Sequence, residues 1–510
     1  MAVPLDARAR TRAGISGIIG AGVALGVGEL LAGVFDPVPS LLAGVGGVVV
    51  DRAPPIVKDV AIALFGTADK GALAIGTVII ALVVGFFTGR AALHRFWVAS
   101  AVFAGFALLG FLAGIGEPLA SGWATAAAAA AAAAAGLGAL GVLLRLARVP
   151  EPGDAAAGDP GRRRFLGVAA AGVVVAASAG AVGRRLLASA PEPAASSLPG
   201  VGDPVPPPGP GEAFAVDGLS PVVTPNDRFY RIDTALVVPR IDADTWRLRV
   251  FGAVEQEVEL TYQDLLAGPL EERYATIACV SNQVGGDLVG NAAWAGVPLT
   301  DVLERAGVRS EGTQIVGRSI DGFTVGFPTE VAFDGRRPLI AIGMNGVPLP
   351  RKHGFPARLI VPGLYGYVSA TKWLTEIELT GWEDFDAYWV PRGWSKEAPI
   401  KTQSRIDVPR TNARVVAGPV AVAGVAWAPT LGIDAVEVRV DGGAWQPCET
   451  SDPLSAAAWV QWRADVELTA GEHTLEVRAT DGTGRPQTDE ESSPRPDGAT
   501  GYHRVTVTAA

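Results

Sequence analysis

Five long apolar segments in the first 190 residues constrain the fold of this chain more than any other feature of its sequence. A helix needs roughly 20 apolar residues to cross a bilayer, and each segment is about that long. They cover residues 13–34, 72–88, 96–115, 123–144 and 165–182. The stretch 41–50 is too short to span, and we expect it to be a re-entrant or interfacial piece. The sequence therefore predicts an all-α transmembrane bundle at the N-terminus.

Arginines gather on one side of these five segments. They precede the first segment and recur between the second and third and between the fourth and fifth, whereas the loops 35–71 and 116–122 hold more acid than base. Basic loops favour the cytoplasmic side. We therefore expect a multi-pass cell-membrane protein whose remainder, after the fifth span, is extracytoplasmic.

Three arginines, Arg162, Arg163 and Arg164, stand directly before the fifth segment and are followed by Phe165 and Leu166. This run resembles a twin-arginine export signal, which is an address read by a receptor. The same arginines would also satisfy the preference of basic residues for the cytoplasmic side. Both interpretations stay open at the level of sequence.

The rest of the chain changes character in steps. Residues 186–212 are rich in proline and glycine and are expected to form a tether. Residues 213–395 mix short strand-like runs with helical pieces, which indicates an α+β domain. Residues 396–510 contain strand-length runs separated by turns, which is typical of an all-β sandwich of immunoglobulin type. The prediction is a multi-domain chain with a membrane domain over residues 1–185.

The charge and the metal-binding residue types exclude several functions. A net charge of −10 argues against a nucleic-acid partner, which would need a basic surface. Only two cysteines, Cys279 and Cys448, and four histidines are present, which excludes a disulfide framework and a zinc or iron–sulfur cage of thiolates. Any metal must therefore rely on one or two protein ligands. Cys448 is expected to be an unpaired structural residue of the β domain.

Polar residues of the middle domain fall into three segments. In the first, Cys279 is followed by three glycines within a dozen residues, which favours a pocket wall over a packed core. The second, residues 351–358, and the third, residues 365–373, are basic, although the chain as a whole is acidic. They indicate an anion or phosphate site. The alternatives are a small buried cysteine and a solvated basic turn.

Together the three segments resemble the sulfite oxidase family. Residues 279–299 look like its molybdenum-binding segment, residues 344–358 like its second signature, and Lys372-Trp373 like its third. The similarity runs from about residue 224 to residue 380. The C-terminal β domain also resembles the family's immunoglobulin-like dimerisation domain, which leaves a homodimer open. The five-span region lies outside the usual family pattern.

The resemblance implies a molybdenum ion held by molybdopterin, with Cys279 as its one protein ligand. A soft thiolate suits such a metal. Cys279 and Arg231 are the expected catalytic residues. The residues expected to bind the cofactor are Tyr230, Arg231, Cys279, Ser319, Asp321, His353, Arg358, Ala370, Thr371 and Lys372.

The sequence also departs from the family. Sulfite oxidases usually place an arginine and a histidine where this chain has Ile232, Asp233 and Thr234, and their active-site tyrosine near residues 319–328 has no clear counterpart. No Cys-x-x-Cys-His motif occurs, and His94 is the only histidine near the spans, so no haem is expected. Electrons would then pass to a separate partner, a cytochrome or a quinone-linked protein.

We therefore predict a membrane-anchored molybdopterin-dependent oxidoreductase that transfers an oxygen atom to or from a small oxyanion or sulfoxide, in the manner of sulfite oxidase. A reductase of methionine sulfoxide or of other S- or N-oxides is the alternative. A non-catalytic, membrane-tethered binding or adhesion protein is the alternative of another class.

Overall fold

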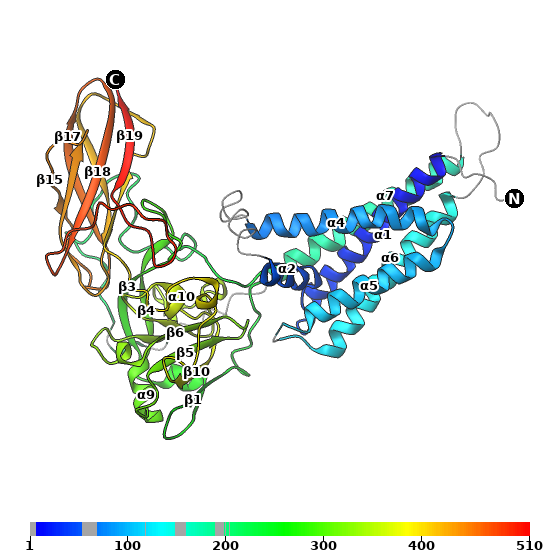
Figure 1. The fold of residues 1–510 in the computed structure, drawn as a ribbon, viewed down its shortest axis with the longest axis horizontal. Coiled ribbons are helices and arrows are strands. Elements are labelled where there is room, and N and C mark those ends of the chain that lie inside the picture. Colours follow the sequence, from blue (N-terminus) through cyan, green and yellow to red (C-terminus); the bar gives the residue numbers. More distant parts are fainter. Residues whose placement is uncertain are drawn as a thin grey trace. The chain divides into compact units, whose positions relative to one another are not determined.

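The computed structural model of this protein describes residues 7–53, 69–117, 119–147, 160–188, 198, 200–202 and 204–510. The chain divides into two units (Figure 1). The first consists of Met1–Pro191 together with Ala235–Arg240, and the second of Glu192–Thr234 together with Ile241–Ala510. The first unit thus includes a strip of chain that comes after the start of the second.

Within the described residues, five helices of the first unit are long and apolar enough to cross a membrane. They coincide with the five predicted segments. They are α1 (Ala7–Val34), α4 (Asp69–Ala92), α5 (Phe96–Gly114), α6 (Gly122–Ala147) and α7 (Pro160–Ala188). The short apolar stretch forms a further helix, α2 (Leu41–Arg52), whose first turn is capped by the Ser40 hydroxyl, which accepts a hydrogen bond from the Ala43 N–H.

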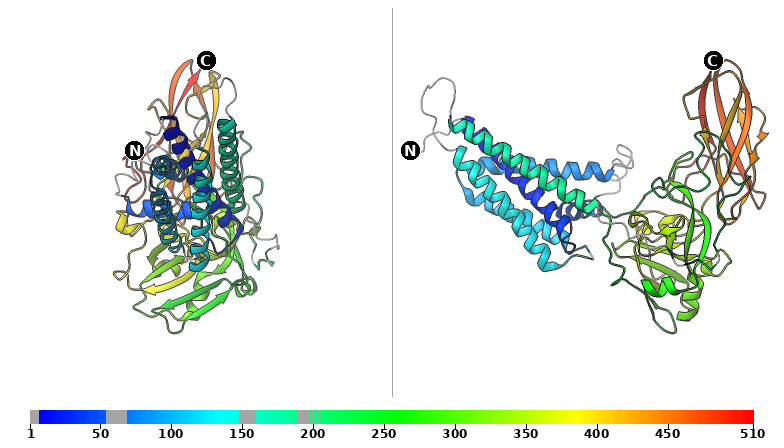
Figure 2. Two further views of the ribbon diagram at one scale, coloured as in Figure 1. Left: turned by 90° about the vertical axis from the view of Figure 1, so that its right-hand side faces the viewer. Right: turned by 180° about the vertical axis from the view of Figure 1, so that it is seen from behind.

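Helix α1 packs against α4, α6 and α7 (Figure 2). Glycines lie at each of these contacts. A Cβ atom at Gly17 would overlap the carbonyl oxygen of Gly85 in α4, and one at Gly183 in α7 would overlap the backbone of Glu29. A Cβ at Gly136 in α6 would lie 2.6 Å from the carbonyl oxygen of Gly20. Small residues let apolar helices approach closely. In lipid there is no hydrophobic driving force for helix association, and close packing takes its place.

The strip Ala235–Arg240 is bonded to the ends of these helices. The Lys70 Nζ atom, at the start of α4, donates to the Ala235 carbonyl oxygen at 2.8 Å. The Arg240 Nη1 atom donates to Asp36 Oδ1 at 2.6 Å and to the Gly33 carbonyl oxygen at 3.3 Å. Residues far apart in sequence thus complete the first unit.

The part of the second unit that precedes residue 400 contains one mixed and one antiparallel β sheet with short helices. One sheet has the order β2 (Val258–Thr261), β1 (Arg247–Gly252), β10 (Leu374–Thr380), β5 (Gln314–Ser319) and β6 (Thr324–Pro328). The other has the order β3 (Glu271–Ala278), β4 (Val289–Pro298), β7 (Leu339–Met344) and β8 (Val347–Pro348), with β9 (Arg358–Ile360) also paired to β7. The helices are α8 (Tyr262–Ala267), α9 (Leu299–Ala306) and α10 (Gly366–Ser369), with single 3₁₀ turns η2 (Thr329–Ala332), η3 (Arg351–His353) and η4 (Val390–Arg392).

The C-terminal part is built of two further sheets. The first has the order β11 (Gln403–Val408), β13 (Gly418–Trp427), β17 (Val460–Leu468) and β16 (Glu449–Thr450). The second has the order β12 (Ala413–Val415), β19 (His503–Ala509), β18 (Gly471–Asp481), β14 (Ile433–Val440) and β15 (Gln446–Pro447). Both sheets contribute to one core, in which Val422 and Trp462 of the first pack with Val477 of the second. The two sheets therefore lie face to face, as the turn-separated strand pattern predicted.

Cys448 lies between β15 and β16, and its N–H donates to the Val436 carbonyl oxygen at 2.8 Å. Its thiol is unpaired, as predicted. Burial raises the pKa of this thiol to about 12, so the residue is an inert, half-buried part of the β sheets.

Candidate functional site

Cys279 directly follows β3 and opens the loop that leads into β4. The loop is closed on itself, because the Cys279 N–H donates to the Leu288 carbonyl oxygen at 2.9 Å and the Asn282 N–H donates to the Cys279 carbonyl oxygen at 3.0 Å. The Asn282 side chain accepts a third bond from the Leu288 N–H at 2.9 Å. The thiol is 8% exposed. Burial raises its pKa, and hydrogen bonds with Ser281 and the charge of Lys372 act against that rise.

The second segment places His353 and Arg358 beside Lys372. Gly354, which follows the 3₁₀ turn η3, has φ +116°, and a Cβ there would lie 3.1 Å from Lys372 Cα and 3.2 Å from Arg358 Cβ. Only glycine suits this conformation and this spacing. The glycine therefore lets the second and third segments meet.

The His353 side chain is 1% exposed and neutral. Its Nε2 atom donates to the Asn226 carbonyl oxygen at 2.8 Å, because a carbonyl can only accept. Burial lowers the pKa of this imidazole to about 3, so Nδ1 carries no proton. Among the described residues Nδ1 has no hydrogen-bond partner, and it is thus a buried acceptor that a ligand N–H or O–H can fill.

Arg358 is 2% exposed and keeps its charge. Burial lowers its pKa to about 10, which is still well above neutrality. Its Nη1 atom donates to the His353 carbonyl oxygen at 3.0 Å, and its guanidinium lies over the Trp294 ring, 4.9 Å from the centroid. Its Nε atom has no partner within the described part of the chain. The charges of Cys279 and Arg358 both act on the pKa of the half-buried Tyr230 phenol, and burial raises that pKa.

Lys372 is held by the segment that follows Tyr230. Its Nζ atom lies 3.1 Å from Asp233 Oδ2 and donates to the Ile232 carbonyl oxygen at 3.1 Å. Burial lowers the pKa of this ammonium to about 8. Arg231 pairs with the same carboxylate at 2.7 Å, but 37% of its side chain is exposed. The Asp233 carboxylate thus joins the two cations.

Trp373, which follows Lys372 in the chain, has an unusual backbone conformation. Its φ is +51°, and its indole Nε1 donates to the Arg351 carbonyl oxygen at 2.8 Å. A bulky residue in the left-handed region is uncommon and persists where its surroundings fix it. The strained turn therefore directs the neighbouring Lys372 toward Asp233.

The remaining predicted site residues lie around Lys372 and Trp373. The turn after β5 contains Ser319 and Asp321, and the Ile320 N–H between them donates to the Trp373 carbonyl oxygen at 3.0 Å. Thr371 is fully buried, and its Oγ1 has no partner among the described residues. Ala370 ends α10. The structure thus brings all the predicted residues into one region, with Arg231 at its exposed edge.

The sequence reasoning did not single out Tyr365, which precedes α10 and is 4% exposed. A Cβ at the next residue, Gly366, would lie 3.7 Å from the Ala278 carbonyl oxygen and 3.9 Å from Tyr230 Oη, so this stretch runs beside Cys279. Burial raises the pKa of Tyr365 to about 12. Its phenol is therefore protonated near the thiol. In the sequence, the signal that could have identified Tyr365 is the pair of tyrosines that flank Gly366 in the third polar segment.

The donor set fits a molybdopterin that carries molybdenum. Three buried polar atoms, on His353, Arg358 and Thr371, lack partners within the described chain, and the buried Lys372 adds a second cation to that of Arg358. A phosphate and a polar ring system need such fixed donors and acceptors. In the described residues no group of three or more His, Cys, Asp or Glu side chains could hold a metal ion.

Comparisons with known proteins point to the same chemistry. A family profile described as "Oxidoreductase molybdopterin binding domain" matches residues 235–389. The chain is 31% identical over 302 residues to human mitochondrial sulfite oxidase, covering 50% of this chain and 55% of that protein. It is 35% identical over 153 residues to the "Uncharacterized oxidoreductase YuiH" of Bacillus subtilis, covering 30% of this chain and 74% of that protein. The chain spans about half the length of the mitochondrial sulfite oxidases that it matches.

A solved structure is similar in fold. The sulfane dehydrogenase SoxCD from Paracoccus pantotrophus superimposes with a TM-score of 0.50 at 24% identity, over 57% of this chain and 81% of that one. The matched profile, the mitochondrial sulfite oxidases and the Bacillus relative lead to one conclusion. The chain belongs to the sulfite oxidase family of molybdopterin-dependent oxidoreductases, and its cofactor is Mo-molybdopterin.

Proposed function

We propose that this protein is a membrane-anchored enzyme that transfers an oxygen atom to or from a small oxyanion or sulfoxide, with Cys279 as the protein ligand of molybdenum. The observation that carries the proposal is the buried Cys279 thiol, whose pKa the charge of Lys372 lowers, with Arg358 nearby. When bound, the molybdenum supplies the two-electron chemistry. In the sulfite-oxidase direction, sulfite and water give sulfate, two protons and two electrons, which leave to a separate partner.

The chain's own residues would hold the cofactor in place. The Arg358 and Lys372 cations neutralise its phosphate, and the unprotonated Nδ1 of His353 accepts a hydrogen bond from its ring system. Thr371 Oγ1 supplies a further buried polar contact. The Lys372 charge lowers the free energy of the Cys279 thiolate, which burial alone would raise.

One observation favours the alternative, a reductase of sulfoxides or other S- or N-oxides. The expected catalytic residue Arg231 donates to Asp233 from both Nε and Nη2, at 2.7 and 3.3 Å. A carboxylate so close offsets much of its attraction for a dianion such as sulfite. A neutral sulfoxide is less affected by that carboxylate.

Metal analysis and two assays on the purified full chain test this proposal. We expect about one molybdenum per chain. Oxidation of sulfite with an artificial electron acceptor would assign the oxidase direction, and reduction of methionine sulfoxide with a reduced dye would assign the reductase. Protein that is folded, free of molybdenum and inactive in both assays would favour the non-catalytic binding protein and contradict the proposal.

The membrane arrangement is part of the proposal. Asp36 and Lys70, at the two ends of a loop predicted to be outside, are bonded to the strip Ala235–Arg240. The chain beyond the fifth span therefore reaches the side on which that loop lies, which supports an extracytoplasmic catalytic domain. The domain limits at residues 185, 212 and 395, an immunoglobulin-like identity for the face-to-face sheets and a homodimer remain predictions.

Cysteine labelling of intact cells tests the topology. In a Cys448→Ala background, Leu119→Cys should react with a membrane-impermeant maleimide, whereas His94→Cys should react only after permeabilisation, because the two exposed positions lie in loops of opposite predicted side. Labelling of His94→Cys in intact cells would overturn the arrangement. Asp154, in the other predicted inside loop, lies outside the described residues.

The same experiment separates the two interpretations of Arg162, Arg163 and Arg164, which are exposed in the first turns of α7. Changing all three to lysine keeps the positive charge but removes the arginine pair. Loss of export of the catalytic domain would favour a receptor-read signal, and unchanged labelling would favour charge alone.

A further inference from the structure

The loop that begins at Cys279 is held from outside its own domain by Arg405 of β11. The Arg405 Nη1 atom donates to the Gly286 carbonyl oxygen at 2.7 Å. The same guanidinium bonds to Asp407 Oδ1 at 2.6 Å and to Ser220 Oγ at 3.0 Å. Its side chain is 9% exposed. Three directed bonds fix the guanidinium, so it fixes the loop in turn.

His503 of β19 forms a second contact with this loop. The edge of its imidazole faces Gly285, which has φ +77°, and a Cβ added there would overlap Cδ2 and Nε2 of the ring. Burial lowers the pKa of His503 to about 4, and Nδ1 accepts a hydrogen bond from the Ile406 N–H at 2.9 Å. The ring is therefore held in place by the strand that contains Arg405.

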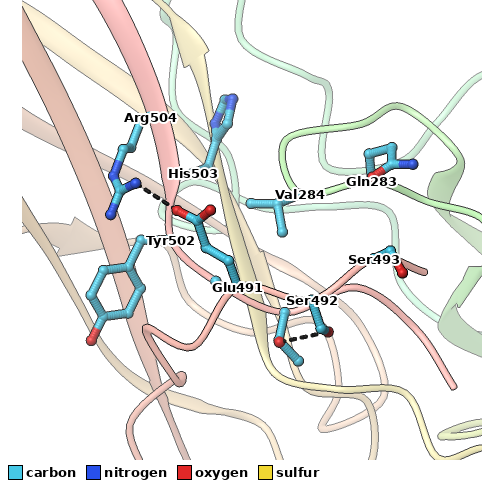
Figure 3. A pocket seen from close by; sticks show the side chains of 10 residues that line it. Gln283, Val284, Glu491, Ser492, Ser493, Tyr502, His503 and Arg504 are labelled. Atoms are coloured by element: carbon cyan, nitrogen blue, oxygen red, sulfur yellow. Dashed lines mark hydrogen bonds and ion pairs between the residues drawn. The ribbon is translucent and has the colours of Figure 1, made fainter. Parts of the chain in front are cut away.

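A displacement of Gly285 or Gly286 would also displace the Cys279 thiol, because a short series of hydrogen bonds within the loop connects them. The Gly286 N–H donates to the Gln283 carbonyl oxygen at 2.9 Å, and Leu288 is bonded to both Asn282 and Cys279. Gln283 and Val284 line an open hollow of about 560 Å³, which residues 491–493 and 500–504 of the C-terminal part also line (Figure 3). At Gln283 and Val284 the loop faces this hollow, so the contacts that hold the loop in place come from Arg405 and His503.

We propose that Arg405 and His503 are positioning residues for the Cys279 loop, so that the C-terminal β sheets help to set where the metal-ligating thiolate lies. This inference rests on the proposed ligation by Cys279. Partners of metal ligands that lie outside the ligand shell typically change metal affinity or activity by roughly 10- to 100-fold when they are altered. The positioning role of Arg405 and His503 thus gives the C-terminal sheets a part in the active site.

A clash and its relief test the contact in the full chain. Gly285→Ala should lower molybdenum content per chain or turnover by roughly 10- to 100-fold and alter the Mo(V) paramagnetic resonance spectrum. Gly285→Ala with His503→Ala removes the overlapping ring and should restore most of the wild-type spectrum. The matched control is Gly484→Ala, since Gly484 also has positive φ, +80°, but open space around it, so the spectrum should stay unchanged.

Arg405→Lys is the second variant, in case Gly285→Ala does not accumulate as folded protein. It keeps the charge but cannot make three directed bonds, so the Mo(V) spectrum should shift while the spectrum of Arg463→Lys, changed at a mostly exposed ion pair, should not.

An unchanged spectrum in both Gly285→Ala and Arg405→Lys, or a double variant no better than Gly285→Ala, would overturn the inference. Cys279→Ser distinguishes a failure of the proposed ligation from a failure of the positioning role. If it leaves the spectrum intact, the ligation itself is wrong, whereas loss of the spectrum only in Cys279→Ser refutes the positioning role alone.

Discussion

Replacing Cys279 by serine should abolish molybdenum-dependent turnover, with a loss larger than the roughly 100-fold that changes around a ligand cause. A serine hydroxyl is harder than a thiolate, and it does not ionise near neutral pH. The buried position of residue 279 adds to the effect, because water has little access to replace the missing ligand. The measurements are molybdenum per chain, the Mo(V) spectrum and turnover with sulfite and with methionine sulfoxide.

The control for this substitution is Cys448→Ser, the same chemical change at the other free cysteine. Cys448 is half buried in the β sheets, so its replacement should lower stability modestly and leave molybdenum content and turnover close to wild type. Wild-type turnover with an unchanged Mo(V) spectrum in Cys279→Ser would exclude Cys279 as the ligand. Equal losses in both variants would show that folding, and not ligation, had been tested.

Lys372→Met should have the second largest effect, on both stability and cofactor binding. It removes one of the two cations that pair with Asp233, whose side chain is 5% exposed, so this carboxylate loses its buried partner and stability should fall, although Arg231 still pairs with it. It also removes a cation that the cofactor phosphate would use. We expect a lower midpoint of thermal unfolding in the apo-protein and little or no bound molybdopterin.

A double variant separates the two effects. Lys372→Met with Asp233→Asn removes both charges of the pair, so stability should recover while cofactor binding should not. Arg463→Met, at an ion pair whose side chains are 51% and 57% exposed, is the control and should change neither. Normal cofactor content in the stable double variant would show that Lys372 supports the fold but does not bind the cofactor.

The sequence predicted well those features that short stretches of chain determine. Apolar runs long enough to span a bilayer became α1, α4, α5, α6 and α7. The three polar segments could be found because glycine and basic residues are unusual beside buried strands. Such signals need only neighbouring residues.

Pairings between distant residues were not predictable in this way. Arg231 was expected at the catalytic centre, but nothing local indicates that Asp233 joins it to Lys372. Likewise Gly285 and Gly286 looked like the wall of a ligand pocket, whereas His503 and Arg405 lie against them from the C-terminal sheets. Each of these contacts depends on the packing of separate sheets, which a single sequence does not specify.

The strip Ala235–Arg240 has a consequence for the order in which the protein can be assembled during synthesis. Domains usually fold in the sequence in which the ribosome delivers them. Here, however, the ends of α1 and α4 obtain partners from residues made well after the last helix. The helical unit therefore cannot finish folding before synthesis of the oxidoreductase domain has begun. A chain cut between α7 and Val222 would yield two incomplete pieces instead of an anchor and an enzyme.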